Sequence, residues 1–239
     1  MRPVLKSAWP QDNGANKSYK PHTIAKADIE SNLHTFCSYC EVFSSDLEVE
    51  HVISQNQDST LANDWDNFLL ACGCCNGRGN KSNQFVDLAT MHFPHRNNTL
   101  LSFIYKEGGL VEVNPALPGK SFDNAQRTLK LVGLDKYLGN PGYPKLNPND
   151  TRWSHRRRAW ENAKKYLPFY ESENLTAKQI ADFAIERGFF SVWFTVFEAH
   201  PDVKKCLIDS FVGTHQNSFD SANGYQPICR NPVNTVDPV

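Results

Sequence analysis

Apolar and polar positions in the first third of the chain predict short elements rather than long helices. Residues 25–34 have a helical pattern, whereas residues 47–52 alternate apolar and charged side chains, as a half-buried strand does. A second apolar run at 67–72 is typical of another strand, and we expect a helix to begin at Asn76. The predicted order within residues 47–88 is therefore strand, loop, strand, helix.

Beyond this segment, residues 99–115 contain two strand-like runs around a pair of glycines, which predicts a hairpin. From residue 120 the pattern turns helical, with candidate helices at 123–134, 151–167, 175–188, 189–200 and 201–211. The pattern predicts an α+β fold in three parts. These are an N-terminal arm at 1–25, a cysteine-rich module with its following hairpin at 26–115, and a mainly helical C-terminal region at 116–239.

Composition narrows the class of protein. The 239 residues are 40% hydrophobic, as in ordinary globular proteins, and the formal net charge is −1. A chain this close to neutral needs local basic patches to meet a phosphate partner. Neither a run of about 18 apolar residues nor an apolar leader is visible, so we expect no membrane insertion and a cytoplasmic location. Thiols are kept reduced there, so the seven cysteines are better explained by metal binding than by disulfides.

Four of these cysteines form two C-x-x-C pairs, Cys37 with Cys40 and Cys72 with Cys75. Each pair places two thiolates on one turn, and four thiolates complete a tetrahedral Zn²⁺ shell. Redox activity of one pair and incidental burial are the alternatives, but neither needs two pairs. We therefore predict a structural zinc site and treat Cys74 as a free thiol.

Polar residues between and after these pairs resemble the HNH, or ββα-metal, nuclease family. The chain has "CSYC", then Glu50-His51, then "DNF" with Asn67, then "CGCCNGRGNK" with Asn76, in the family's order. The resemblance covers roughly residues 35–85 and implies a zinc-stapled ββα-metal module. It departs from the usual pattern in having Glu50 in place of aspartate and Asn76 where many members have histidine.

The chemistry of these side chains agrees with that resemblance. Phosphodiester hydrolysis needs a base that works near neutral pH, for which His51 is suited, and a cation on the developing negative charge. Glu50 and Asn76 supply hard oxygen ligands for Mg²⁺ or Mn²⁺. By the resemblance, Asn67 braces the loop and orients the histidine. A satisfied structural histidine is the alternative for His51.

Two groups of basic residues are candidates for contacts with a substrate. Arg78 and Lys81 follow Asn76 and are suited to hold a phosphate, or else lie on a solvated helix face. The basic segment from Arg152 to Lys165 carries six Lys or Arg residues against one acidic residue; we favour a structural role, with phosphate or partner contact as the alternative. His92 and His95 lie outside the motif, and we expect surface or structural roles for them.

The segments "MRPVLKSAWP", "FCSYCE", "LEVEHVISQ" and "WDNFLLACGCCNGRGNK" are also similar to the HNH subunit of Septu-type bacterial anti-phage systems, some of which are encoded with retrons. That resemblance implies a nuclease effector, an ABC or SMC-like ATPase partner and, in retron-linked systems, a reverse transcriptase with its RNA and DNA. Two alternatives remain: a non-catalytic zinc module that binds nucleic acid or proteins, and a free-standing restriction-type endonuclease. The sequence leaves DNA and RNA substrates, including tRNA, equally open.

Overall fold

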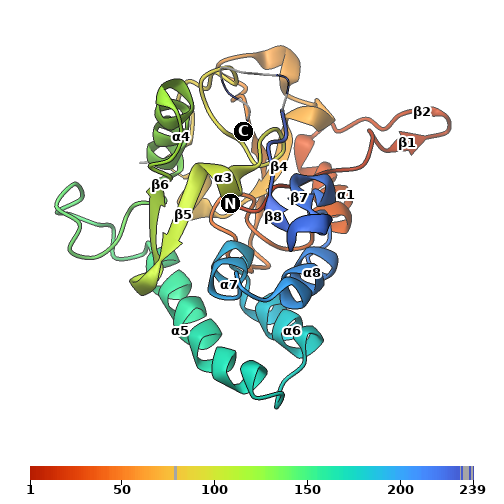
Figure 1. Ribbon diagram of the computed structural model, residues 1–239. Coiled ribbons are helices and arrows are strands. Elements are labelled where there is room, and N and C mark those ends of the chain that lie inside the picture. The colour runs from red at the N-terminus through yellow and green to blue at the C-terminus, as the bar shows by residue number, and fades with distance from the viewer. Residues whose placement is uncertain (78–79, 232, 234–236, 238) are drawn as a thin grey trace.

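The computed structural model describes residues 1–77, 80–231, 233, 237 and 239, and it has the mixed α+β architecture predicted from the sequence (Figure 1). Its strands pair as antiparallel two-stranded sheets: β1 (Gln11–Asp12) with β2 (Ala15–Asn16), β3 (Glu48–His51) with β4 (Phe68–Ala71), β5 (Phe103–Lys106) with β6 (Leu110–Val113), and β7 (Phe219–Asp220) with β8 (Gln226–Pro227). The helices are α1 (Lys26–Leu33), α2 (Gly73–Asn76), α3 (Thr99–Ser102), α4 (Gly119–Val132), α5 (Arg152–Glu171), α6 (Ala177–Arg187), α7 (Phe190–Val196) and α8 (Pro201–Ser210). None of the described helices is both long and apolar enough to cross a bilayer.

The β3–β4 pair is the centre of the cysteine-rich module, as the alternating pattern predicts. Its register places His51 opposite Phe68 and Glu50 opposite Leu69. Leu69 and its neighbours on β4 are fully buried, while β3 keeps a polar face, so the two strands form one wall between the core and solvent.

The predicted helix from Asn76 onward is wrong over the described residues 80–88, because α2 ends at Asn76 after one turn. The chain folds back there: the Lys81 amide donates to the Cys75 carbonyl at 3.1 Å. At Gly77, a Cβ atom would lie 2.3 Å from the Gly73 carbonyl oxygen, so the turn needs glycine. Asn76, which was interpreted as the start of a helix, instead leads into a tight turn.

The first 25 residues pack closely against the rest of the chain at both ends of the segment. Val4 and Tyr19 are buried, and the Arg2 guanidinium donates to the Phe211 carbonyl at 2.7 Å and the Leu33 carbonyl at 3.2 Å. Between these anchors, the β1–β2 hairpin projects away from the body (Figure 1). Only this hairpin resembles the arm expected from the polar composition.

Two apolar cores organise the fold. The first gathers the β3–β4 sheet, the β5–β6 hairpin and α4, and the second gathers the helices α5 to α8. Phe36, next to the first zinc-type cysteine, is buried in the second core against Phe211, with ring centroids 5.0 Å apart. The cysteine-rich module is therefore packed directly onto the helical region.

The helices end where capping chemistry predicts. Thr176 and Gln179 form a capping box at the start of α6, and Gly188 follows its last turn with a φ of 73°. Helix α5 runs four residues past the predicted end at 167 and contains Pro168 near its last turn. Beyond α8, the chain returns beside the first core, where Asn98 donates to the Ser218 and Ile228 carbonyls, both at 2.8 Å.

Candidate active site and zinc centre

The four predicted cysteines meet in one cluster. Cys37 and Cys40 lie on a turn before β3, Cys72 follows β4, and Cys75 lies on α2. Their sulfur atoms all lie within 4.8 Å of one another, and those of Cys40 and Cys72 are 3.6 Å apart. Tetrahedral thiolates about 2.3 Å from a zinc ion are separated by roughly 3.8 Å, so the cluster fits Zn²⁺. All four cysteines are free of disulfides.

The electrostatics of the cluster favour the thiolate form of Cys37. Burial raises the pKa of Cys37, but hydrogen bonds from the three other thiols outweigh it and hold that pKa well below the ordinary value. Burial raises the pKa values of Cys40 and Cys75. Cys74 stays outside the cluster, partly exposed, with its sulfur 3.8 Å from the Asn149 carbonyl oxygen.

Helix α5 contacts the zinc centre through Arg152. This buried guanidinium donates to the Cys75 sulfur at 3.1 Å and to the Val132 carbonyl at 2.6 Å. It also pairs with Asp150 at 2.6 Å. A positive group beside a thiolate offsets the negative charge that four thiolates leave around one Zn²⁺.

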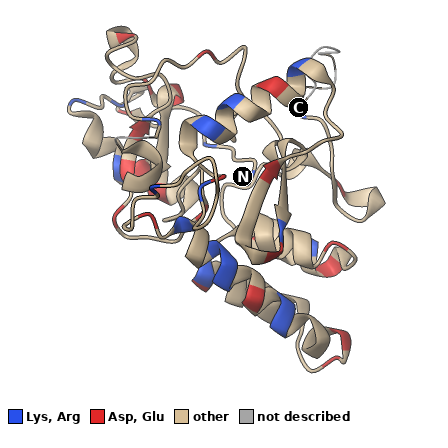
Figure 2. Cartoon of the chain, turned by 90° about the vertical axis from the view of Figure 1, so that its left-hand side faces the viewer, with Lys and Arg blue, Asp and Glu red and all other residues tan. Residues whose placement is uncertain are grey.

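The rest of the basic segment divides between the core and the surface. Arg156 is buried and donates to the Gly109 and Leu134 carbonyls at 2.6 and 3.0 Å. Arg157 pairs with Glu161 at 2.7 Å on the solvent side, and basic stretches along α5 alternate with acidic ones in Figure 2. Arg152 and Arg156 thus have the structural role favoured by the sequence. Arg157 faces solvent, because successive residues point to different sides of a helix.

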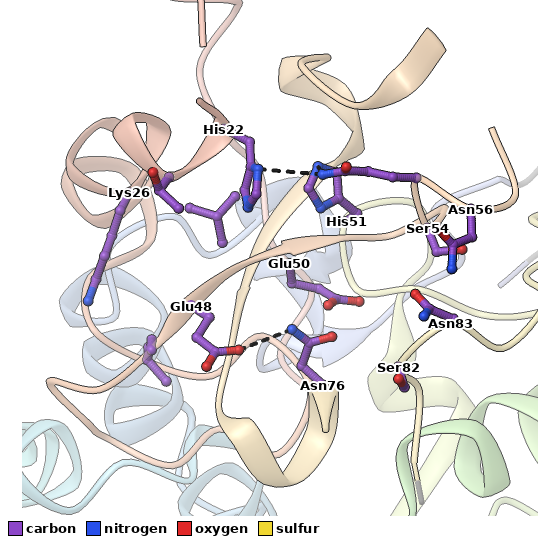
Figure 3. Close-up of a pocket in the computed structure, with 14 residues that line it drawn as sticks. His22, Lys26, Glu48, Glu50, His51, Ser54, Asn56, Asn76, Ser82 and Asn83 are labelled. Atoms are coloured by element: carbon purple, nitrogen blue, oxygen red, sulfur yellow. Dashed lines mark hydrogen bonds between the residues drawn. The ribbon is translucent and has the colours of Figure 1, made fainter. Parts of the chain in front are cut away.

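A cleft of about 630 Å³ lies over β3 and receives residues from four parts of the chain (Figure 3). The residues that line it are His22, Thr23, Lys26, Leu47, Glu48, Val49, Glu50, His51, Ser54, Gln55, Asn56, Asn76, Ser82 and Asn83. Glu50, His51 and Asn76, which the sequence singled out, all reach it. Asn67 is not among the residues that line this cleft; it is buried where the loop between β3 and β4 ends.

The His51 imidazole is held in one orientation. Its Nε2 lies 2.9 Å from the Ala62 carbonyl oxygen. A carbonyl only accepts hydrogen bonds, so Nε2 carries the proton in the neutral ring and Nδ1 keeps its basic lone pair. Phe68 packs against the ring, with centroids 5.2 Å apart. Burial lowers the pKa of His51, which keeps the ring neutral over a wider pH range.

Asn67 braces the loop that supplies this carbonyl. Its side-chain oxygen accepts from the Ile53 amide at 2.8 Å, and its Nδ2 donates to the Ile53 and Leu61 carbonyls at 2.9 and 3.2 Å. Leu61 immediately precedes Ala62. The side chain thereby closes the loop between β3 and β4 onto itself.

Glu50 is almost fully buried and already has a cationic partner. Its carboxylate lies 2.5 Å from the Lys81 ammonium and accepts from the Tyr39 hydroxyl at 3.2 Å. Burial raises the pKa of Glu50, while the Lys81 charge opposes that rise. Lys81 is itself 0% exposed and donates to the His51 carbonyl at 2.6 Å. The sequence interpretation gave Lys81 a phosphate contact or a place on a solvated helix face; in the structure its ammonium is buried against Glu50 and the His51 carbonyl instead.

Glu48 is a cleft residue that the sequence reasoning missed. It lies two positions before Glu50 and therefore on the same face of β3, and its carboxylate accepts from the Asn76 amide at 3.2 Å. The alternation of Glu48, Val49 and Glu50 could have identified it. Two carboxylates and the Asn76 amide oxygen, gathered on one side of the cleft in Figure 3, form a donor set suited to Mg²⁺ or Mn²⁺.

His22 and Gln55 are further cleft residues without an obvious sequence signal. The His22 ring packs edge-on against His51, with centroids 4.5 Å apart, although the two histidines are 29 positions apart in the chain. The Gln55 amide nitrogen donates to His22 Nδ1 at 3.4 Å. It also lies 3.1 Å from His51 Nε2, but without a hydrogen bond there, because that nitrogen carries the proton that the Ala62 carbonyl accepts. Arg78 lies outside the described residues.

The two histidines that follow the motif lie outside the cleft. His92 is buried, with Nδ1 2.8 Å from the Ser102 hydroxyl and Nε2 2.9 Å from Asp237. The serine is 0% exposed, so this arrangement ties chain segments together and offers no nucleophile to a substrate. Burial lowers the pKa of His95 to about 3. Both positions agree with structural roles.

Comparison with known families agrees with this geometry. Residues 37–82 match the family model of HNH endonucleases, a span that begins at the first cysteine of the cluster and ends one residue past Lys81. This segment is therefore similar to an HNH module, and the match supports metal-dependent nuclease activity. No curated protein matches the chain.

Proposed function

We propose that the cleft hydrolyses phosphodiester bonds in nucleic acid with the help of a divalent cation. The observation that carries the proposal is the pairing of an oriented imidazole, His51, with a carboxylate donor set in one cleft over β3. The match of residues 37–82 to HNH endonucleases supports the same reaction class.

In this proposal His51 is the general base. The Ala62 carbonyl holds Nε2–H, so Nδ1 takes the proton from the attacking water. The same carbonyl stabilises the imidazolium that forms, because it accepts a stronger hydrogen bond from the charged ring. Asn67 is a positioning residue that acts through the loop carrying Ala62.

Glu50 and the Asn76 side-chain oxygen would hold the cation, with Glu48 beside them. A bound Mg²⁺ or Mn²⁺ supplies positive charge to the phosphate and to the leaving oxygen. Lys81 and Tyr39 both contact Oε1 of Glu50, so Glu50 would offer its other carboxylate oxygen to the cation. The zinc centre would remain structural, fixing Asn76 on α2 against Glu48 on β3.

We also propose that the chain is an effector subunit of a bacterial anti-phage complex with an ABC or SMC-like ATPase, and in retron-linked systems with a reverse transcriptase and its RNA and DNA. The support is the resemblance of "LEVEHVISQ" and "WDNFLLACGCCNGRGNK" to Septu-type HNH subunits. DNA and RNA, including tRNA, are both candidate substrates. Arg78 stays a proposed phosphate contact.

A non-catalytic zinc module that binds nucleic acid or proteins is the second candidate. It is favoured by one observation, the ion pair that already neutralises Glu50 with a buried lysine. In that case the cleft residues would serve stability and recognition, and His51→Ala would leave biological effect unchanged.

The deciding experiment compares wild type with His51→Ala on plasmid, single-stranded DNA, total RNA and tRNA, with and without Mg²⁺ or Mn²⁺. His155→Ala, an exposed histidine on α5, is the matched control. Metal-free arms use Mg²⁺-free buffer rather than strong chelator, because a chelator would also strip zinc. Each protein is tested alone and co-purified with a neighbouring ATPase subunit.

The proposal expects cleavage that needs the divalent cation, persists in His155→Ala and is lost in His51→Ala. Equal cleavage by wild type and His51→Ala, at equal zinc content, contradicts it. Absence of cleavage from the triggered complex favours the binding module instead.

A further inference from the structure

The segment from Tyr19 to Lys26 forms one wall of the cleft over β3. A short 3-10 helix, η1 (His22–Ala25), leads directly into α1, and His22 and Lys26 both line the cleft. The segment is held firmly. Tyr19 is buried, stacks on Trp65 with centroids 5.7 Å apart, and donates to Asp28 at 2.9 Å.

The free nitrogen of His22 faces the cleft. Gln55 engages Nδ1, so Nε2 is the ring nitrogen left for a ligand, and in Figure 3 it points into the cleft. Within the described part of the chain, Nε2 makes no hydrogen bond. Because the ring also packs against His51, any group bound at His22 lies beside the proposed general base.

Lys26 extends this wall by one helical turn. His22 begins η1 and Lys26 begins α1, which follows it directly, and both side chains line the cleft. The Lys26 ammonium donates to the Ser45 carbonyl at 3.2 Å and lies 3.6 Å from Glu30, with 37% of its side chain exposed. Both contacts are partly exposed to solvent, so the ammonium can exchange them for an anion at the rim of the cleft.

The two sides of the cleft differ in charge and are suited to different ligands. Glu48 makes one side of the cleft negative, since the charge of Glu50 is already offset by Lys81, and this side suits a cation rather than a phosphate. On the wall formed by the segment from Tyr19 to Lys26, His22 supplies a hydrogen-bond donor and Lys26 a positive charge. A nucleic-acid backbone, with a phosphate at each nucleotide, can place one phosphate at the cation and another at this wall.

We propose that His22 Nε2 and the Lys26 ammonium form a phosphate-binding wall that holds the nucleic-acid backbone beside the phosphate under attack. The inference rests on the proposed nuclease function for the identity of the ligand, a nucleic-acid phosphate. The inference also gives His22, one of the first 25 residues, a role in binding the substrate.

The test measures binding apart from cleavage. A fluorescein-labelled 20-nucleotide single-stranded DNA, and RNA of the same sequence, are titrated in Mg²⁺-free buffer by fluorescence anisotropy. The variants are His22→Gln and Lys26→Gln. The controls are His34→Gln and Lys120→Gln, which change an exposed histidine and an exposed lysine outside the cleft. Zinc content and melting temperature verify that each protein is folded.

We expect each variant to raise Kd roughly 10-fold, the usual effect of losing one charge-assisted hydrogen bond. Lys26→Gln should also reduce the slope of log K against log salt by about 0.7, since one phosphate contact is lost. Both controls should bind as wild type does.

Binding by His22→Gln and Lys26→Gln within twofold of wild type overturns the inference, as does wild-type protein that binds neither oligonucleotide. If His22→Gln lowers kcat while Kd and KM stay unchanged, His22 only positions His51, and the phosphate-binding wall is again rejected. If binding depends on His22 but wild type cuts nothing in the triggered complex, the nuclease proposal fails and the binding wall stands.

Discussion

At the residue scale, the Glu50–Lys81 pair is the most informative contact in the cleft. Both side chains are buried, and their charged atoms lie 2.5 Å apart. A buried pair contributes little net stability, but removal of one partner leaves an uncompensated charge. The positive charge of Lys81 also favours the ionised form of the Glu50 carboxylate, which is the form that binds a divalent cation.

Lys81→Met should therefore lower the free energy of unfolding by about 3 kcal/mol in Mg²⁺-free buffer. Millimolar Mg²⁺ should restore part of this loss, because the cation can take the position of the ammonium beside Glu50. Urea unfolding at constant zinc content measures both effects. Glu50→Gln/Lys81→Met should recover most of the stability, and full stability of Lys81→Met alone would contradict this role of the pair.

At the same scale, the family order of the motif singled out Glu50, His51, Asn67 and Asn76, and the structure brings Glu50, His51 and Asn76 to one cleft. It misplaced the ammonium of Lys81, since the backbone turn after Asn76 was interpreted as a helix start. His22 carried no signal, because its contact with His51 depends on how the 3-10 helix η1 packs beside β3. Contacts made through tertiary packing leave no local pattern to find.

At the element scale, helix α5 is tied to the zinc centre. Its first residue, Arg152, donates to the Cys75 sulfur and, through the Val132 carbonyl, to the end of α4. The sequence showed a basic helix, but not which arginines were buried, because three consecutive arginines fit several helix rotations.

Arg152→Gln should release zinc faster, by roughly 10-fold, because groups that hydrogen-bond to metal ligands typically change metal affinity by 10- to 100-fold. Zinc transfer to a chromophoric chelator, followed over time, measures this. Arg157→Gln is the matched control, since Arg157 lies on the solvent side of the same helix. Equal release rates for both variants would show that the contact with Cys75 does not stabilise the metal.

The elements themselves were predicted well where the apolar period was long or capping residues were present. The hairpin at β5–β6 and the helices from α4 to α8 were found, as was the β3–β4 pair. The one-turn helices α2 and α3 were not, because four residues are too few to establish a period.

At the scale of the whole molecule, Phe36 joins the two apolar cores. It precedes Cys37 directly, yet its ring is 3% exposed within the helical core. The zinc centre and the helical region therefore share neighbouring residues, and we expect them to unfold together.

Phe36→Ala should lower the free energy of unfolding by about 3 to 5 kcal/mol, as for other buried phenylalanines. Phe43→Ala, which truncates a ring that is 51% exposed, should cost far less. Thermal unfolding followed by calorimetry compares the two. Two separate transitions in the wild-type protein, or equal losses in both variants, would contradict a shared core.

Single-turnover cleavage with Mg²⁺, by zinc-loaded wild type and His51→Ala at equal zinc content, tests the central claim most directly. We expect the cleavage rate of His51→Ala to be lower than that of wild type by at least about 100-fold, because the general base is lost. Cleavage by His51→Ala at the wild-type rate would contradict a catalytic role for this cleft.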